Sequence, residues 1–153
     1  MKYWLMKSEP DVFGIADLKS RPRQTEPWDG VRNYQARNFL RAMKPGDQAF
    51  FYHSSCAEPG VAGIVRIVRA AYPDPSAFDP KSPFFDARSA PEKPVWFMVD
   101  VKLLREMKRL VPLSELKTKA TLKNMRLLSR GNRLSVMPVT ATEWNAILKL
   151  EKD

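Results

Sequence analysis

The sequence is poor in the residues on which metal sites, disulfides and phosphate-binding glycine loops depend. Its 153 residues include one cysteine, one histidine and six glycines. A single cysteine cannot form an internal disulfide, and one cysteine with one histidine cannot supply the usual ligand set of a zinc site. The glycines do not have the spacing of a Walker loop or of a dinucleotide-binding fingerprint. We therefore expect no metal and no cofactor.

Long apolar runs are also missing from the sequence. None approaches the length of about 20 residues that a membrane-spanning helix needs. Polar residues follow soon after the N-terminus, at Lys7, Ser8 and Glu9, which does not fit a secretory signal peptide. We expect no membrane association and a cytoplasmic location, with the nucleus as the alternative in a eukaryote. The length suits one domain with a hydrophobic core, covering residues 1–153.

Acidic residues are outnumbered, since 26 lysines and arginines stand against 17 aspartates and glutamates, for a net charge of +9. Such a surface attracts polyanions, and nucleic acid is the commonest of these. Basic residues are densest between Lys102 and Arg133, where the only carboxylates are Glu106 and Glu115. We expect this segment to hold backbone phosphates through Lys102, Arg105, Lys108, Arg109, Lys123, Arg126, Arg130 and Arg133.

The hydrophobic pattern predicts short strands interrupted by short helices. Strands are expected over residues 2–7, 48–54, 61–69, 95–104 and 134–139, and short helices over 14–19 and 112–117. Thr140 and Glu143 have the spacing of a capping box for a closing helix. Residues 71–94, rich in Pro, Asp, Ser and Phe, predict a long loop. This order favours an α+β domain with one mixed sheet curved into a barrel and flanked by helices.

The stretch from Trp28 to Asn38 combines aromatic, basic and amide side chains at the junction of a loop and a helix. The helix is predicted from the apolar face of Ala36, Phe39, Leu40 and Met43, with Asn33 as its N-cap. The free N–H groups of a helix N-terminus can hold a phosphate or the polar edge of a base. Equally, Trp28 and Tyr34 can be core aromatics and the arginines a solvated helix face. Composition alone favours neither interpretation.

Catalytic signatures are few. His53 and Cys56 are three residues apart, yet no orienting partner or oxyanion site accompanies them. A structural or ligand-lining role for His53 is therefore favoured over catalysis. Strand alternation places Tyr52 and Ser54 on one face of their strand, from which their polar groups can reach the same cavity.

Four motifs together resemble the EVE domain family. They are Lys7–Pro10, Trp28–Asn38, Phe51–Ser54 and Ser135–Val139, and the similarity runs from near residue 2 to near residue 148. The resemblance implies a PUA-like pseudobarrel related to the YTH readers of methylated adenine. It also implies recognition of modified bases in DNA or RNA, without an established catalytic activity.

The resemblance further implies which residues would form the site. Trp28 would be the stacking wall of a base pocket, with Lys7, Ser8 and Glu9 at its rim. Further candidates for the pocket lining are Asn33, Tyr52, His53 and Ser54. The remaining motif residues would either support the loop or contact the ligand, namely Val31, Arg32, Tyr34, Arg37 and Asn38.

The combined expectation is a non-catalytic module that binds nucleic acid and recognises a modified base, for example a methylated or hydroxymethylated one. Two alternatives stay open. One is an enzyme acting on RNA or a nucleotide, with Glu9 or His53 as acid or base. The other is a regulatory domain for a small anion. The choice between DNA and RNA, the modification and the oligomeric state are left open as well.

Overall fold

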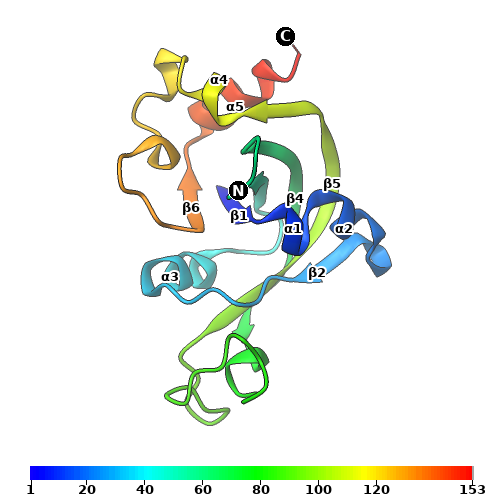
Figure 1. Ribbon diagram of the computed structural model, residues 1–153, viewed down its shortest axis with the longest axis vertical. Coiled ribbons are helices and arrows are strands. Elements are labelled where there is room, and N and C mark those ends of the chain that lie inside the picture. The colour runs from blue at the N-terminus through cyan, green and yellow to red at the C-terminus, as the bar shows by residue number, and fades with distance from the viewer. Residues whose placement is uncertain (153) are drawn as a thin grey trace.

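A six-stranded mixed sheet forms the centre of the computed structural model, which describes residues 1–152 (Figure 1). Its strand order is β2-β5-β4-β3-β1-β6. The strands are β1 (Tyr3–Ser8), β2 (Thr25–Pro27), β3 (Gln48–His53), β4 (Gly60–Pro73), β5 (Phe97–Pro112) and β6 (Val136–Val139). Within the described residues only β1 and β3 pair in parallel. The expected α+β class and mixed sheet are confirmed, although the sheet curves without closing, because β2 and β6 end the strand order.

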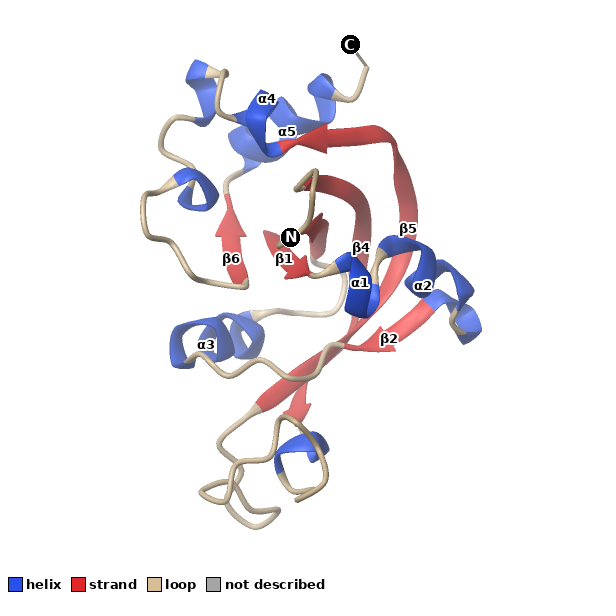
Figure 2. Cartoon of the chain, viewed as in Figure 1, coloured by secondary structure: helices blue, strands red, loops and turns tan. Residues whose placement is uncertain are grey.

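Short helices flank the sheet (Figure 2). They are α1 (Pro10–Phe13), α2 (Ile15–Ser20), α3 (Tyr34–Ala42), α4 (Leu113–Leu116) and α5 (Ala141–Leu150). Asn33 caps α3 by accepting a hydrogen bond from the Ala36 N–H at 2.9 Å, as expected. The capping box of Thr140 and Glu143 at the start of α5 is also present. These side chains satisfy N–H groups that the first helical turn leaves without partners.

Three elements differ from the sequence-based expectation. β4 and β5 run on to Pro73 and Pro112, because they pair with each other from Gly60↔Pro112 to Pro73↔Phe97. The ends of this ladder carry exposed charged residues and lack a clear apolar alternation, so the pattern underestimates both strands. α1 precedes the first helix that the pattern predicts, over residues 14–19, and Pro10 stands at its start, where a missing N–H costs nothing.

The two faces of the sheet carry separate cores. Trp4, Met6 and Phe51 belong to the first core, which α3 covers with Ala36 and Leu40. Neighbouring residues on the same strands, Leu5, Phe50 and Tyr52, point the other way and form the second core together with Trp144 and Ile147 of α5. This division follows from the two-residue period of a strand.

The loop between β4 and β5, residues 74–96, lies at the lower end of Figure 1. It was expected to begin at residue 71, but β4 occupies its first positions. The Asp74 N–H donates to the Trp96 carbonyl at 3.0 Å, which joins the two ends of the loop. A one-turn 3-10 helix at Pro75–Ala77 and a bridge between Ala90 and Lys93 add further order.

Candidate functional site

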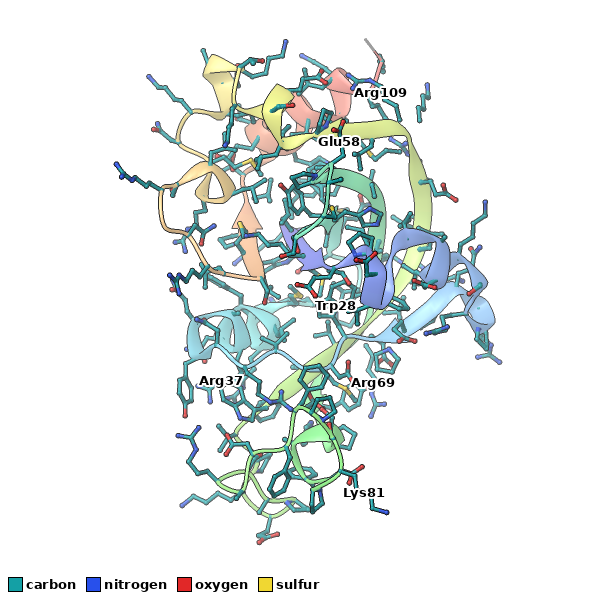
Figure 3. All side chains as sticks on the ribbon, in the orientation of Figure 1. Trp28, Arg37, Glu58, Arg69, Lys81 and Arg109 are labelled. Carbon is teal, nitrogen blue, oxygen red and sulfur yellow. The ribbon has the colours of Figure 1, made fainter. Side chains whose placement is uncertain are left out.

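A cavity of about 520 Å³ lies where β1 ends, beside the segment that connects β2 to α3. Its lining comes from the end of β1, from α1, from residues 26–32, and from Phe84 and Ser135 in two other loops. Figure 3 shows Trp28, one of the lining residues, near the middle of the molecule. The volume falls in the range of ligand pockets, about 300 to 1,000 Å³. A nucleobase or a molecule of similar size would fit.

Trp28 forms a rigid wall of this cavity. Its side chain packs edge-on against Phe51, with ring centroids 5.5 Å apart, and against Phe13 at 6.4 Å. The backbone N–H of Trp28 donates to the Val99 carbonyl at 2.7 Å. Trp28 is only 7 % exposed, so it belongs to the first core and lines the cavity at the same time. Both interpretations of this residue, core aromatic and pocket wall, therefore apply.

The end of β1 supplies polar groups to the cavity. The Ser8 hydroxyl donates to the Phe13 carbonyl at 2.5 Å, which connects β1 to α1. The Lys7 N–H donates to the Ser135 carbonyl at 2.8 Å. Burial lowers the pKa of the Lys7 ammonium, and within residues 1–152 it forms no ion pair. Glu9 is exposed, and its carbonyl accepts from the N–H groups of Val12 and Phe13.

Arg32 and Asp74 hold the cavity loop onto the loop between β4 and β5. Asp74 is fully buried and accepts from the Gly30 N–H at 2.8 Å and from Arg32 Nη1 at 3.1 Å. It also accepts from the N–H and hydroxyl of Ser76, at 2.9 and 2.6 Å. Arg32 donates in addition to the Phe84 carbonyl, at 3.0 Å from Nε and 2.8 Å from Nη2. This arginine therefore positions the wall of the cavity.

Gly30 is needed at its position for two reasons. Its φ of +80° lies in the left-handed region, which other residues adopt at a cost. A Cβ atom there would also lie 2.7 Å from the Phe84 ring. The glycine thus lets Phe84 pack directly on the backbone of the cavity loop.

The structure brings some of the expected site residues together and leaves others apart. The cavity collects Lys7, Ser8, Glu9 and Trp28, together with Val31 and Arg32. Asn33 is engaged as the cap of α3 and does not line the cavity. Tyr34, Arg37 and Asn38 lie along α3, outside it.

The third motif lies outside the cavity, contrary to expectation. Tyr52 faces the second core on the opposite side of the sheet, where burial, with a smaller effect of Cys56, raises its pKa to about 12. His53 packs behind α2, where its Nε2 accepts from the Ile15 N–H at 3.1 Å. The Ser54 N–H donates to the Ser8 carbonyl at 3.0 Å. His53 and Ser54 therefore support the end of β1 from its parallel neighbour, and Tyr52 and Ser54 do not share this cavity.

Several contributors were missing from the expected site. Asp74, which does not line the cavity, holds its loop through Gly30. The missing lining residues are Val12, Phe13, Arg21, Glu26, Pro27, Asp29, Gly30, Phe84 and Ser135. Asp74 and Phe84 lie in or beside the long loop, where the sequence gives no periodic signal that would place a side chain. Ser135 opens the last motif of the family resemblance, so a signal for it was present.

His53 gives a pH-dependent stability that can be measured. Burial lowers its pKa below the ordinary value of 6.5, so the unfolded chain takes up a proton before the folded chain does. We expect the free energy of unfolding to fall as the pH drops from 7.5 to 5.5, by at most about 1.4 kcal/mol for each pH unit. Urea unfolding at each pH tests this. In His53→Gln, which removes the single histidine, the same pH step should disappear; an unchanged step would contradict the assignment.

The basic segment from Lys102 to Arg133 is spread over β5, α4 and the loops that follow. In Figure 1, residues 117–135 lie to the left and β5 runs along the right side. Arg105 binds the buried carboxylate of Glu151 at 2.5 Å, and Arg109 binds Glu115 at 2.8 Å. Arg126 packs over the Phe39 ring at 5.3 Å. Of the eight basic residues expected to hold phosphates, those without an ion pair in the part of the chain described are Lys102, Lys108, Lys123, Arg126, Arg130 and Arg133.

The described residues, 1–152, were compared with the requirements of a membrane-spanning helix and of a metal site. No helix among them has the length and apolar character needed to cross a membrane. No cluster of three or more His, Cys, Asp or Glu side chains in this range has the arrangement of a metal site.

Comparison with known proteins identifies the relatives of this chain. The family described as EVE domain matches residues 2–150. Human thymocyte nuclear protein 1 is 53% identical over 167 residues, which cover 98% of this chain and 74% of that protein. The crystal structure of human THYN1 protein in complex with 5-methylcytosine-containing DNA superposes with a TM-score of 0.95 at 51% identity, covering 100% of this chain and 99% of that one.

A more distant likeness concerns the fold alone. The YTH domain of the Zygosaccharomyces rouxii MRB1 protein, solved with N6-methyladenosine RNA, has a TM-score of 0.55 at 16% identity. It covers 99% of this chain and 86% of that one. The expected structural relation to YTH domains is therefore confirmed at the level of the fold.

Proposed function

Because the chain belongs to the EVE domain family, we propose that it is a non-catalytic nucleic-acid-binding module that captures a modified base. The base would occupy the cavity lined by Trp28, and 5-methylcytosine in DNA is the first candidate. The observation that carries this proposal is a cavity of nucleobase size with a fixed aromatic wall and polar groups at its rim. The human relative solved with 5-methylcytosine-containing DNA supports the choice of ligand.

The energetics of base capture agree with this cavity. Turning a base out of a duplex costs a few kcal/mol, which aromatic stacking and hydrogen bonds to the Watson–Crick edge must offset. Stacking on one aromatic side chain contributes about 1 to 3 kcal/mol. Ser8, Glu9 and Asp29 lie at the cavity and can contact the edge of the base. Burial, with a smaller effect of Asp74, raises the pKa of Asp29.

The enzyme alternative has less support. His53 lies outside the cavity and its Nε2 is already an acceptor for the Ile15 N–H. Cys56 does not line the cavity either, so Glu9 has neither a histidine nor a thiol beside it there. The small-anion alternative relied on the helix N-terminus at Asn33, whose side chain caps α3.

Binding to matched oligonucleotides tests the proposal. Duplex and single-stranded DNA, and RNA of the same sequence, would each carry one 5-methylcytosine or one cytosine. A methyl group sensed by an apolar surface contributes about 1 to 3 kcal/mol, so we expect the methylated form of the preferred nucleic acid to bind about 5- to 150-fold more tightly. Equal affinities for the methylated and unmethylated forms would overturn the proposal. A steep salt dependence by itself would show only a general affinity for polyanions.

The remaining basic residues of the 102–133 segment stay candidates for phosphate contacts within this proposal. A cytoplasmic or nuclear location and binding to RNA are likewise predictions.

A further inference from the structure

Alternating aromatic and guanidinium groups lead from the cavity wall to the molecular surface. The Arg32 guanidinium lies 5.5 Å from the centre of the Phe84 ring and 5.4 Å from that of Trp96. Trp96 packs in turn against Tyr34, with ring centroids 4.9 Å apart and planes inclined by 31°. The Arg37 guanidinium lies 5.0 Å from the centre of the Tyr34 ring. These contacts connect Phe84, which lines the cavity, to Tyr34, which lies outside it.

Tyr34 presents an exposed ring on a rigid support. Tyr34 is 50 % exposed, whereas Trp96, against which it packs, is 2 % exposed. Trp96 Nε1 donates to Asp86 at 2.8 Å, which fixes the indole ring. Isolated exposed aromatics are common on protein surfaces and need no explanation. Nucleic-acid bases, however, stack on aromatic side chains in positively charged surroundings.

Positive charge surrounds this ring. Tyr34, Arg37 and Arg41 have the spacing of one face of α3, and Arg41 is exposed, with its guanidinium 4.6 Å from the centre of the Phe97 ring. Arg88 from the loop between β4 and β5 interacts electrostatically with Tyr34 while it pairs with Asp86 at 3.1 Å. Arg105 and Arg109, in contrast, are bound by the carboxylates of Glu151 and Glu115.

We propose that the exposed face of Tyr34 stacks a nucleotide that neighbours the captured base on the same strand, while Arg41 contacts that strand's phosphates. This inference rests on the proposed function, because it requires a modified base in the cavity. It makes the surface formed by Tyr34, Arg37 and Arg41 a second subsite for nucleic acid. The protein would then read a short strand segment and hold its backbone beside α3.

A cycle of protein and oligonucleotide changes tests the stacking contact. Duplex DNA with a central 5-methylcytosine would carry an abasic site at each neighbouring position in turn. Wild type should lose about 5- to 150-fold in affinity when the base facing Tyr34 is absent. Tyr34→Leu should lose a similar factor on the intact duplex and lose nothing more at that one abasic position. Tyr34→Phe, which keeps the ring, should bind as wild type does.

The outcomes separate this inference from the proposed function. Wild-type affinity in Tyr34→Leu, or an equal loss on every abasic duplex, would overturn the stacking contact while leaving the preference for 5-methylcytosine intact. Loss of that preference in wild type would instead overturn the proposed function.

The phosphate contact of Arg41 is tested by salt dependence. Arg41→Gln should make the negative slope of log K against log salt shallower by about one. Lys149→Gln, an exposed change on α5, should leave the slope unchanged; an equal effect of the two changes would overturn the role of Arg41.

Discussion

Replacing Trp28 with leucine should weaken binding to 5-methylcytosine DNA by about 5- to 150-fold. The change removes the aromatic wall of the cavity, and stacking on one ring contributes about 1 to 3 kcal/mol. Leucine keeps an apolar side chain in the first core, to which Trp28 also belongs. Titration by fluorescence anisotropy at low temperature, where the variant stays folded, measures the loss.

A second buried tryptophan supplies the matched control. Trp144 in α5 is 3 % exposed and stacks on Phe50 and Tyr3, with centroid distances of 3.9 and 4.4 Å. It belongs to the second core, on the other side of the sheet from Trp28. Trp144→Leu should lower the melting temperature but leave the affinity for methylated DNA unchanged. Equal affinity losses in the two variants would mean that Trp28 acts through stability and not as a base-binding wall.

Replacing Asp74 with asparagine should both destabilise the protein and weaken base binding. Its carboxylate is fully buried, and it accepts hydrogen bonds from Gly30, Arg32 and Ser76. Asparagine would remove the charge that balances Arg32 and turn an NH₂ group towards one of these donors. Breaking a partly buried charged network of this kind costs about 2 to 4 kcal/mol. For a chain of this length that is a drop in melting temperature of about 5 to 15 °C, measurable by calorimetry.

Asp47 allows the two effects of the Asp74 change to be separated. It is also buried, and it accepts from the Lys2 N–H, the Lys44 N–H and Trp4 Nε1 at 3.0, 3.0 and 3.1 Å. It does not line the cavity. Asp47→Asn should therefore reduce the melting temperature by a comparable amount without changing the affinity for methylated DNA. If Asp74→Asn likewise left the affinity unchanged, the Arg32–Asp74 network would have no part in shaping the site.

Much of the fold could be predicted from the sequence, because local rules determine it. The N-cap at Asn33, the capping box at Thr140 and the alternation of Phe50 and Phe51 between the two cores follow from nearest-neighbour geometry. The lengths of β4 and β5 could not be predicted, since their outer parts are determined by pairing with each other and not by an apolar pattern.

The site was predictable only in part, for a related reason. Residues close together in the chain were correctly grouped, as with Lys7, Ser8 and Glu9 at the cavity. Contacts between distant segments, such as that of Asp74 with Gly30, have no local signature. Tyr52 was wrongly grouped with the site for another reason. It belongs to a family motif, but its side chain packs in the second core, on the other side of the sheet.

The position of β1 in the sheet determines when the site can form during synthesis. β1 leaves the ribosome before the other strands of the sheet but lies between β3 and β6, and its residues Tyr3–Met6 pair with Val136–Val139. Contacts across so long a stretch of chain form late, since loop closure must be completed before they stabilise anything. The cavity needs Ser135 beside Lys7, so a nascent chain has no complete site until its last strand emerges. Unfinished chains would therefore not compete with finished protein for modified bases.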